Sequence, residues 1–260
     1  MSQDPYIHIA GVDKVYPSKR GPIHALQGIE LSIAEGEFIS ILGPSGCGKS
    51  TLLKCVAALE PISKGEIRLA GERVTRPPDK LGIVFQRDVL FDWRTILDNV
   101  LVSAELRGFN PRDFETRARD LLKLFGLEQY ADRYPWELSG GMRQRASICR
   151  ALVVDPSLLL MDEPFGALDA LTRDELNLEL RRTWQETHKT VIFITHSITE
   201  AVYLSGRIVV MARDPGRIAE IIEVDLPSER PLAIRDTAEF GRYNTYIRRM
   251  FSDMGVLKGD

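Results

Sequence analysis

Residues 38–51, FISILGPSGCGKST, decide the fold of this chain of 260 residues. Four of the first five residues are apolar, and the run ends at a Gly-Pro pair, which predicts a short buried strand followed by a turn. Beyond the turn, Leu53, Val56 and Leu59 recur at a spacing of three, which places them on one face of a helix. A strand, a glycine-rich turn and a helix in this order predict the first part of an α/β core.

The turn itself matches the pattern G-x-x-x-x-G-K-[ST]. Its glycines let backbone N–H groups point inward around phosphate oxygens, and the helix that follows presents its positive end to them. Lys49 can then reach the β- and γ-phosphates of a nucleotide, while the Ser50 hydroxyl can bind Mg²⁺. A chance match is expected in roughly one chain in a hundred. We therefore predict a nucleotide site formed by Gly43, Pro44, Ser45, Gly46, Cys47, Gly48, Lys49, Ser50 and Thr51.

The composition excludes several other classes of protein. Hydrophobic residues make up 44% of the chain, too many for a disordered protein, and the formal charge of −3 argues against binding to nucleic acid through net positive charge. No apolar run approaches the ~18–20 residues of a membrane span, and the first ten residues do not resemble a secretion signal. The three cysteines, Cys47, Cys55 and Cys149, form neither a disulfide framework nor a metal-binding pair. We expect an intracellular protein that binds no nucleic acid.

Three later apolar runs predict further strands of the core. They are short and bounded by turn residues, and two are rich in β-branched residues, as in parallel strands buried on both faces. A helix is predicted over residues 171–188, between the first run and the second. Strands and helices therefore alternate, which predicts an α/β fold. The three runs are 158–161, 190–195 and 208–211.

Two other regions differ from this core. Residues 6–15 and 23–33 flank a turn-rich segment and predict antiparallel strands, whereas residues 88–151 carry helical patterns and no clear strand. The helices that we expect outside the core are 96–106, 111–125, 140–151 and 237–251. We predict one domain over residues 1–260, with a nucleotide-binding core and antiparallel β subdomain (1–87 and 152–225), a helical insert (88–151) and a short helical tail (226–260).

Residues 158–164, LLLMDEP, form an apolar run that ends in two carboxylates. Asp162 stands at the end of the predicted strand, where it can hold Mg²⁺ directly or through water. Glu163 is a candidate general base that would orient and polarise an attacking water. With the phosphate loop, these residues supply both halves of a nucleotide–Mg²⁺ site, a combination that many P-loop kinases and GTPases share.

Residues 138–145, LSGGMRQR, distinguish between such families. Ser139 can cap a helix that begins near Gly140, and the two glycines, Gly140 and Gly141, let a phosphate approach the exposed backbone N–H groups closely. This is a second anion site in a chain with one phosphate loop. A second chain would therefore supply the nucleotide that binds there.

In this order, the phosphate loop, LSGGMRQR and LLLMDEP resemble the nucleotide-binding subunit of an ABC transporter, over about residues 6–225. The resemblance implies the ABC ATPase fold, ATP and Mg²⁺ as ligands, and a head-to-tail dimer in which ATP lies between Lys49 of one copy and Ser139 of the other. It also implies four further roles. Gln86 would sense Mg²⁺ and the attacking water, His196 would contact the γ-phosphate, Asp169 in the segment Ala167-Leu168-Asp169 would cross the dimer interface, and Tyr16 would stack on adenine.

Three more segments resemble the nitrate/sulfonate/taurine importer ATPases: PPD at 77–79, VFQRDVLFDW at 84–93 and RDPGRI at 213–218. Such a protein would work at the cytoplasmic face of the cell membrane, with membrane-spanning permease subunits and an external solute-binding protein. In that family a groove beside the glutamine loop receives a coupling helix of the permease. The stretch from Gln86 to Trp93 could form this contact, or its apolar residues could pack against the helical insert. The resemblance does not identify the solute.

Two other functions stay open for a chain with a phosphate loop. A soluble ABC ATPase could serve cofactor assembly without a membrane partner, and copurification with membrane proteins would distinguish it. A P-loop kinase would transfer phosphate to a small molecule, although LSGGMRQR counts against it. A requirement for an acceptor other than water would reveal the kinase.

Overall fold

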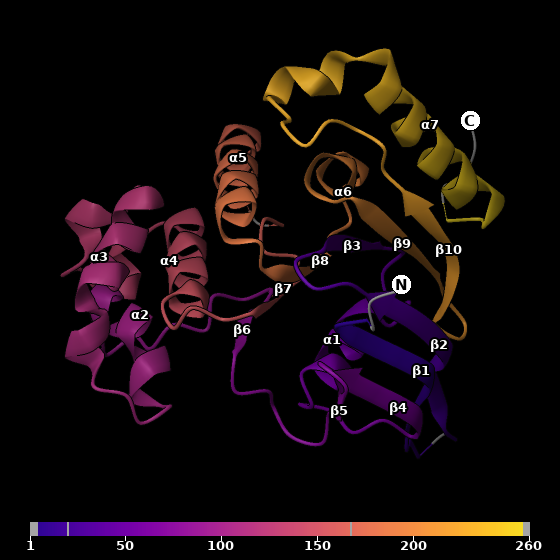
Figure 1. Ribbon diagram of the computed structural model, residues 1–260, viewed down its shortest axis with the longest axis horizontal. Coiled ribbons are helices and arrows are strands. Elements are labelled where there is room, and N and C mark those ends of the chain that lie inside the picture. The colour runs from indigo at the N-terminus through magenta and orange to yellow at the C-terminus, as the bar shows by residue number, and fades with distance from the viewer. Residues whose placement is uncertain (1–4, 20, 167, 257–260) are drawn as a thin grey trace. The chain divides into compact units, whose positions relative to one another are not determined.

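The computed structural model describes residues 5–19, 21–166 and 168–256. The contacts within the chain form two compact units. Unit 1 comprises Met1–Asp79 and Thr190–Asp260, and unit 2 comprises Lys80–Lys189. Figure 1 shows that each unit contains both strands and helices.

An antiparallel sheet forms the first part of unit 1. Its strands lie in the order β2-β1-β4-β5, and each is antiparallel to its neighbours (Figure 1). Inward-facing residues alternate with others along β1 except at an irregularity between Ile9 and Val12, and Ile7, Ile9 and Val12 are fully buried. The prediction of two antiparallel strands in this part of the sequence is thus confirmed. The strands are β1 (Ile7–Tyr16), β2 (Ile23–Ile33), β4 (Lys64–Leu69) and β5 (Glu72–Arg73).

The second group of strands in unit 1 carries the phosphate loop. β3 lies between β8 and β9 and runs parallel to both, while β10 is antiparallel to β9. Every residue of β3 and β8 is buried, as expected for parallel strands that are covered on both faces. These strands are β3 (Phe38–Leu42), β8 (Thr190–Ile194), β9 (Arg207–Ala212) and β10 (Arg217–Glu223).

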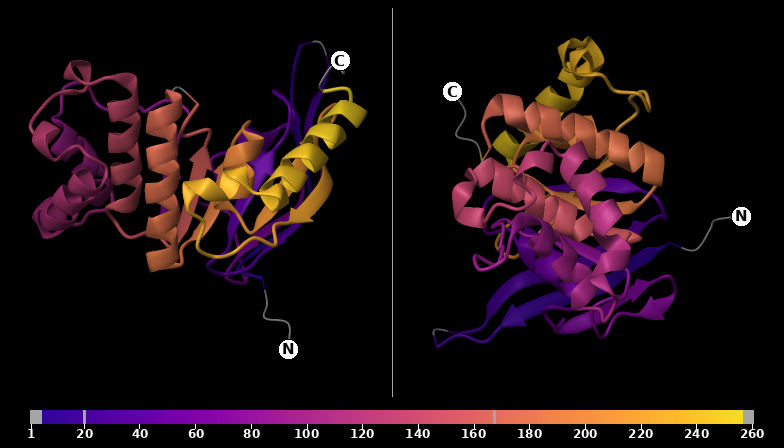
Figure 2. Two further views of the ribbon diagram at one scale, coloured as in Figure 1. Left: turned by 90° about the horizontal axis from the view of Figure 1, so that it is seen from above. Right: turned by 90° about the vertical axis from the view of Figure 1, so that its left-hand side faces the viewer.

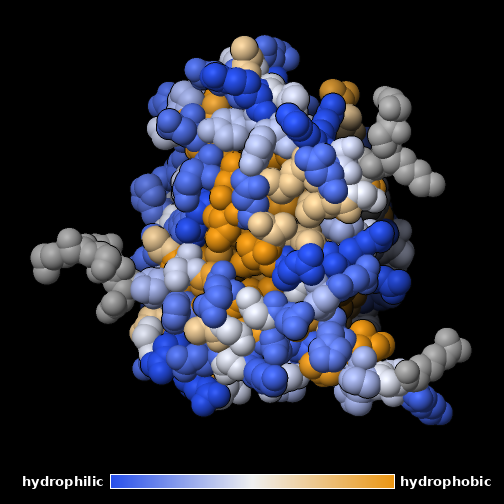
Figure 3. All heavy atoms as spheres, turned by 90° about the vertical axis from the view of Figure 1, so that its right-hand side faces the viewer, coloured by the Kyte–Doolittle hydropathy of each residue, from blue (hydrophilic) through white to orange (hydrophobic). Residues whose placement is uncertain are grey.

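Helices cover the strands of unit 1. α6 packs against β3 and against α7, which buries Phe240, Ile247 and Phe251 along one face. Figure 3 shows a face of the molecule on which apolar side chains gather between hydrophilic ones. Among the described helices of the whole chain, none combines the length and the apolar character that a membrane span requires. The helical elements are α1 (Lys49–Val56), α6 (Ile198–Leu204), a 3₁₀ turn (Leu232–Asp236) and α7 (Ala238–Asp253).

Unit 2 combines two parallel strands with a group of helices. β6 (Leu81–Val84) and β7 (Leu158–Asp162) are paired in parallel. The helices α2, α3 and α4 pack against one another, and Figure 2 shows them as one group. The helices are α2 (Ile96–Glu105), α3 (Glu115–Leu124), α4 (Gly140–Leu152) and α5 (Ala170–Thr187), with 3₁₀ turns at Pro111–Phe114, Glu128–Tyr130 and Pro135–Glu137.

The helix predicted over residues 111–125 differs from the one observed. It begins as a 3₁₀ turn, and the α-helix starts only at Glu115. Pro111 occupies the first position of the turn, where a missing N–H is tolerated, and the Asn110 side chain accepts a hydrogen bond from the N–H of Arg112 at 3.3 Å. The other predicted helices agree with the structure to within two residues at each end.

Hydrogen bonds from Arg230 connect the C-terminal segment of unit 1 to α6. Its guanidinium is buried, and it donates hydrogen bonds to the carbonyl oxygens of Val202, Tyr203 and Ser205 at 2.8–3.1 Å. These carbonyls stand at the end of α6, where a helix provides no partners of its own. Arg230 therefore acts as the cap of this helix from a residue outside it.

Replacing Arg230 by Met should lower the free energy of unfolding by about 3 kcal/mol, because several buried carbonyls lose their hydrogen-bond donor. Urea unfolding followed by circular dichroism measures the change. The matched control is Arg242→Met, which removes a guanidinium on a side chain that is 77% exposed. We expect this control to change the stability by less than ~0.5 kcal/mol. Equal effects of the two substitutions would contradict the capping role.

Candidate functional site

The phosphate loop of unit 1 has the backbone that its glycines predict. Gly46 and Gly48 adopt positive φ angles of 81° and 93°, which residues with a side chain rarely tolerate. Gly48 caps the start of α1, so Lys49 is the first residue of the helix. The Lys49 ammonium is buried inside the loop and donates to the carbonyl oxygens of Gly43 at 2.8 Å and Pro44 at 3.2 Å. The loop thus presents an ammonium and a helix N-terminus together.

Close backbone packing holds this loop in place. A Cβ atom at Gly48 would lie 2.7 Å from the carbonyl oxygen of Ala25 on β2. A Cβ atom at Gly216, in the turn between β9 and β10, would lie 2.4 Å from the same oxygen and 2.4 Å from the carbonyl oxygen of Cys47. Gly216 also accepts a hydrogen bond from the N–H of Gln27 at 2.9 Å. The loop therefore packs between β2 and the β9–β10 turn. This turn is part of the RDPGRI segment.

His196 follows β8 at the same edge of the sheet at which the phosphate loop follows β3. β3 and β8 are parallel neighbours, with Ile41 opposite Ile194, so the residues that follow both strands meet at one edge. The Thr195 hydroxyl accepts a hydrogen bond from the N–H of Ser197 at 3.0 Å and donates to Glu200. This turn fixes the backbone on both sides of His196, whose side chain is exposed.

Tyr16 ends β1, opposite Ile23 of β2, and its side chain is half-buried. It belongs to unit 1, like the phosphate loop and His196. The half-buried ring is anchored in the sheet and still accessible to a ligand.

In unit 2 the structure brings Gln86 and Glu163 together. β6 and β7 are parallel, with Val84 opposite Met161, so the residues that follow them leave one edge. The Gln86 side-chain amide donates to Glu163 Oε2 at 3.2 Å. Glu163 has a φ of 47°, a left-handed conformation that costs a residue with a side chain about 1–3 kcal/mol. Such strain is concentrated at functional sites, and here it turns the chain directly after Asp162.

Asp162 and Ser50 offer the kind of ligands that Mg²⁺ prefers. The Asp162 carboxylate is buried at the end of β7, and Ser50 places a hydroxyl on the first turn of α1. Among the described residues no group of three or more His, Cys, Asp or Glu side chains could hold a metal ion by itself.

The LSGG segment forms a capped helix start, as predicted. Ser139 accepts a hydrogen bond from the N–H of Met142 at 3.3 Å and so caps α4. Ser139 and Gly140 are exposed, and Gly141 is half-buried. A Cβ atom at Gly141 would lie 2.9 Å from Leu168 Cδ2, so a larger residue would displace that side chain. The helix start is therefore accessible to a ligand from outside the chain.

Asp169 follows Leu168 and caps α5. Its carboxylate accepts a hydrogen bond from the N–H of Thr172 at 3.0 Å, and this bond holds the pKa of Asp169 below its usual range. Ala167, which the sequence places in the same segment, lies outside the described residues.

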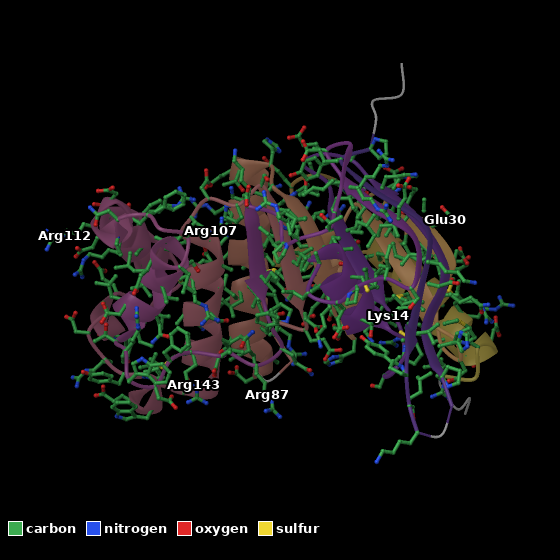
Figure 4. All side chains as sticks on the ribbon, turned by 90° about the horizontal axis from the view of Figure 1, so that it is seen from below. Lys14, Glu30, Arg87, Arg107, Arg112 and Arg143 are labelled. Atoms are coloured by element: carbon green, nitrogen blue, oxygen red, sulfur yellow. The ribbon has the colours of Figure 1, made fainter. Side chains whose placement is uncertain are left out.

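Three side chains of α4 that received no role of their own from the sequence bind the segment after β6. Arg143 Nε donates to the Asp88 carboxylate at 2.9 Å, and Gln144 donates to the carbonyl oxygen of Phe85 at 3.2 Å. Arg150 donates to the carbonyl oxygen of Asp88 at 2.8 Å. Figure 4 labels Arg143 and Arg87 at one edge of unit 2. The LSGG helix therefore holds the segment that carries Gln86.

Comparisons with known proteins place these features in a family. The model of the ABC transporter family matches residues 26–166. An ABC transporter ATP-binding protein of Methanocaldococcus jannaschii is 44% identical, over 97% of this chain and 93% of its own. The aliphatic sulfonates import ATP-binding protein SsuB of Bacillus cereus is 43% identical, over 97% of this chain and 98% of its own. The taurine import ATP-binding protein TauB of Rhizobium johnstonii is 47% identical, over 78% of each chain.

Solved structures confirm the predicted fold. The dimeric structure of a bacterial ABC transporter cassette is 33% identical, with a TM-score of 0.78 over 85% of this chain and 100% of its own. A dimeric post-hydrolysis state of an ATP-binding cassette with ADP and Pi is 32% identical, with a TM-score of 0.77 over the same shares. Together with the family match, these likenesses show that the chain belongs to the ABC transporter family and is one of its ATP-hydrolysing, ATP-binding proteins.

Proposed function

We propose that the chain is the ATPase subunit of an importer for a small sulfonate, taurine, nitrate or similar solute. The support is the identity of 43–47% with two proteins named as import ATP-binding proteins for aliphatic sulfonates and taurine, one of them matched over 98% of its length. The subunit would work at the cytoplasmic face of the cell membrane. It would drive membrane-spanning permease subunits that receive the solute from an external binding protein.

The site residues suggest how ATP would be hydrolysed. Lys49 and the N–H groups of its loop bind the β- and γ-phosphates, His196 contacts the γ-phosphate and Tyr16 stacks on the adenine. Water held by Gln86 attacks the γ-phosphorus in line, its proton passes to Glu163, and the bond to the bridging oxygen breaks to release ADP. Mg²⁺, held by Ser50, Asp162 and Gln86, would neutralise the charge that develops on the phosphate oxygens.

A second copy of the chain would complete each site. Ser139 and Gly140 are exposed at the start of α4, which suits contact with the γ-phosphate of an ATP bound by another copy, and Asp169 would cross the same interface. The similar solved cassettes are described as dimeric, and one of them holds ADP and Pi. ATP would close this dimer, because the γ-phosphate is the group that the second copy contacts.

The permease would contact the segment between Gln86 and Trp93. The Trp93 side chain is 73% exposed and stacks on Phe91 at a ring distance of 5.0 Å. Asn99 of α2 holds the Phe91 backbone with hydrogen bonds of 2.7 Å and 3.0 Å. This combination of a fixed backbone and an exposed aromatic ring suits an interface anchor.

Uptake by reconstituted vesicles tests the proposed function. The chain is combined with candidate permease and solute-binding proteins from its own organism, and ATP-dependent uptake of taurine, an aliphatic sulfonate and nitrate is measured. Uptake of one of these solutes is the expected result. ATP hydrolysis without uptake, together with copurification with soluble partners only, would favour a role in cofactor assembly. A requirement for a phosphate acceptor other than water would indicate a kinase.

Replacing Glu163 by Gln should lower the rate of ATP hydrolysis by at least about 100-fold, because the amide cannot accept the proton of the attacking water. ATP binding and dimer formation should persist. Phosphate release measures the rate, and size-exclusion chromatography with ATP measures the dimer. Glu229→Gln, at an exposed residue of unit 1, is the control and should hydrolyse ATP normally. Near-normal turnover of Glu163→Gln would refute its assignment as general base.

Replacing Gly216 by Ala should weaken ATP binding about tenfold or more, because the added methyl group would collide with backbone atoms and shift the phosphate loop. Equilibrium binding of a fluorescent ATP analogue measures the affinity. Gly206→Ala is the matched control, since a Cβ atom there meets nothing within 4 Å and the φ angle is not positive. Unchanged affinity in Gly216→Ala would show that the loop does not depend on this turn.

A further inference from the structure

Lys14 is a buried charged residue on β1. It is 5% exposed and occupies an inward-facing position of the strand, as Val12 does two residues earlier. Figure 4 labels Lys14 in unit 1. A buried ammonium is costly unless it is paired, so the identity of its partners indicates what it does.

The residues that follow α1 hold the Lys14 ammonium. It donates to the Glu60 carboxylate at 3.0 Å and to the carbonyl oxygen of Pro61 at 2.7 Å. The Glu60 side chain is 32% exposed, so the ion pair lies partly within the protein. Because α1 begins at the phosphate loop, these bonds join β1 to the far end of the phosphate-binding helix.

The same ammonium lies 4.5 Å from the centroid of the Tyr16 ring. This is within the ~6 Å that a cation–π interaction requires. Lys14 and Tyr16 are two residues apart on β1, so both side chains leave the same side of the strand. The cation lies over one face of the half-buried ring, so a stacking partner would have to use the opposite face.

We propose that Lys14 is a positioning residue for the nucleotide base: held by Glu60 and Pro61, its ammonium fixes the Tyr16 ring so that one face is presented to the adenine. The proposal rests on the proposed function, in which Tyr16 stacks on that base. A lysine suits this role because its compact charge bonds to a carboxylate and a carbonyl while it lies over a ring. If Lys14 only stabilised the fold, its loss would weaken the binding of the base and of the phosphates to the same extent.

Inorganic tripolyphosphate separates the base from the phosphates, since it can occupy the phosphate loop without stacking on Tyr16. In Lys14→Met, the KM for ATP should rise roughly five- to tenfold with kcat unchanged, as expected for a lost cation–π contact and weakened stacking. Inhibition of the ATPase by tripolyphosphate should stay within about twofold of the wild-type value, because the phosphate loop is unaltered. Lys14→Arg, which keeps the charge, should restore most of the affinity for ATP.

A double variant and a stability measurement distinguish the proposed role from a loss of folding. Lys14→Met/Glu60→Gln removes both charges of the ion pair and leaves no unpaired carboxylate at this half-buried position. Thermal unfolding is measured for every variant. If the affinities for ATP and tripolyphosphate fall together with the melting temperature, Lys14 is a structural residue and the proposal is overturned.

Tyr16→Leu separates this proposal from the proposed function. It should raise the KM for ATP, and adding Lys14→Met to it should raise the KM no further, because the lysine acts through the ring. A raised KM in Tyr16→Leu with an unchanged KM in Lys14→Met would overturn the role of Lys14 alone. An unchanged KM in Tyr16→Leu would overturn the assignment of Tyr16 to the base, and the role of Lys14 with it.

Discussion

The close approach of three backbone segments around the phosphate loop is the constraint on which unit 1 depends. The carbonyl oxygen of Ala25 occupies the space that a side chain would need at Gly48 and at Gly216. β2, the loop and the β9–β10 turn can therefore pack together only where these two residues lack a Cβ atom. The anion-binding shape of the loop thus depends on an antiparallel sheet that precedes it and on a turn about 170 residues further along the chain.

The sequence predicts the elements whose signals are local. β3, α1 and α4 lie where an apolar run, a glycine-rich turn or a Ser-Gly-Gly cap predicts them. It does not predict β4, whose six residues Lys64–Leu69 include three charged ones, or α6, whose seven residues are too few to show a helical period. β4 forms because it pairs with β1 and β5, and α6 forms because it packs against β3 and α7. Such partners are information that no short window of sequence contains.

The residues of the candidate site also fall into those that the sequence predicts and those that it does not. The phosphate loop, Ser139 and the pair Asp162–Glu163 are predicted from their chemistry and from the strand or helix beside them. The partners of Lys14 and Arg143 are not, because Glu60 is 46 residues from Lys14 and Asp88 is 55 residues from Arg143. A motif specifies which chemical group is present, whereas only the fold specifies which distant group holds it in place. The RDPGRI segment illustrates this, since its resemblance to importer ATPases is visible in sequence but the packing of Gly216 is not.

Glu163 shows why a site residue can conflict with local preference. Its left-handed backbone would suit glycine, and glycine would relieve about 1–3 kcal/mol of strain. Glycine would also remove the carboxylate that accepts the hydrogen bond from Gln86. The N–H of Gly166 donates to the carbonyl oxygen of Glu163 at 3.2 Å, so the chain turns directly after this residue. The strained conformation persists since β7 is buried along its whole length and fixes the point at which the chain must turn. The chain therefore loses stability through the strained backbone of residue 163 because a carboxylate is needed at that position.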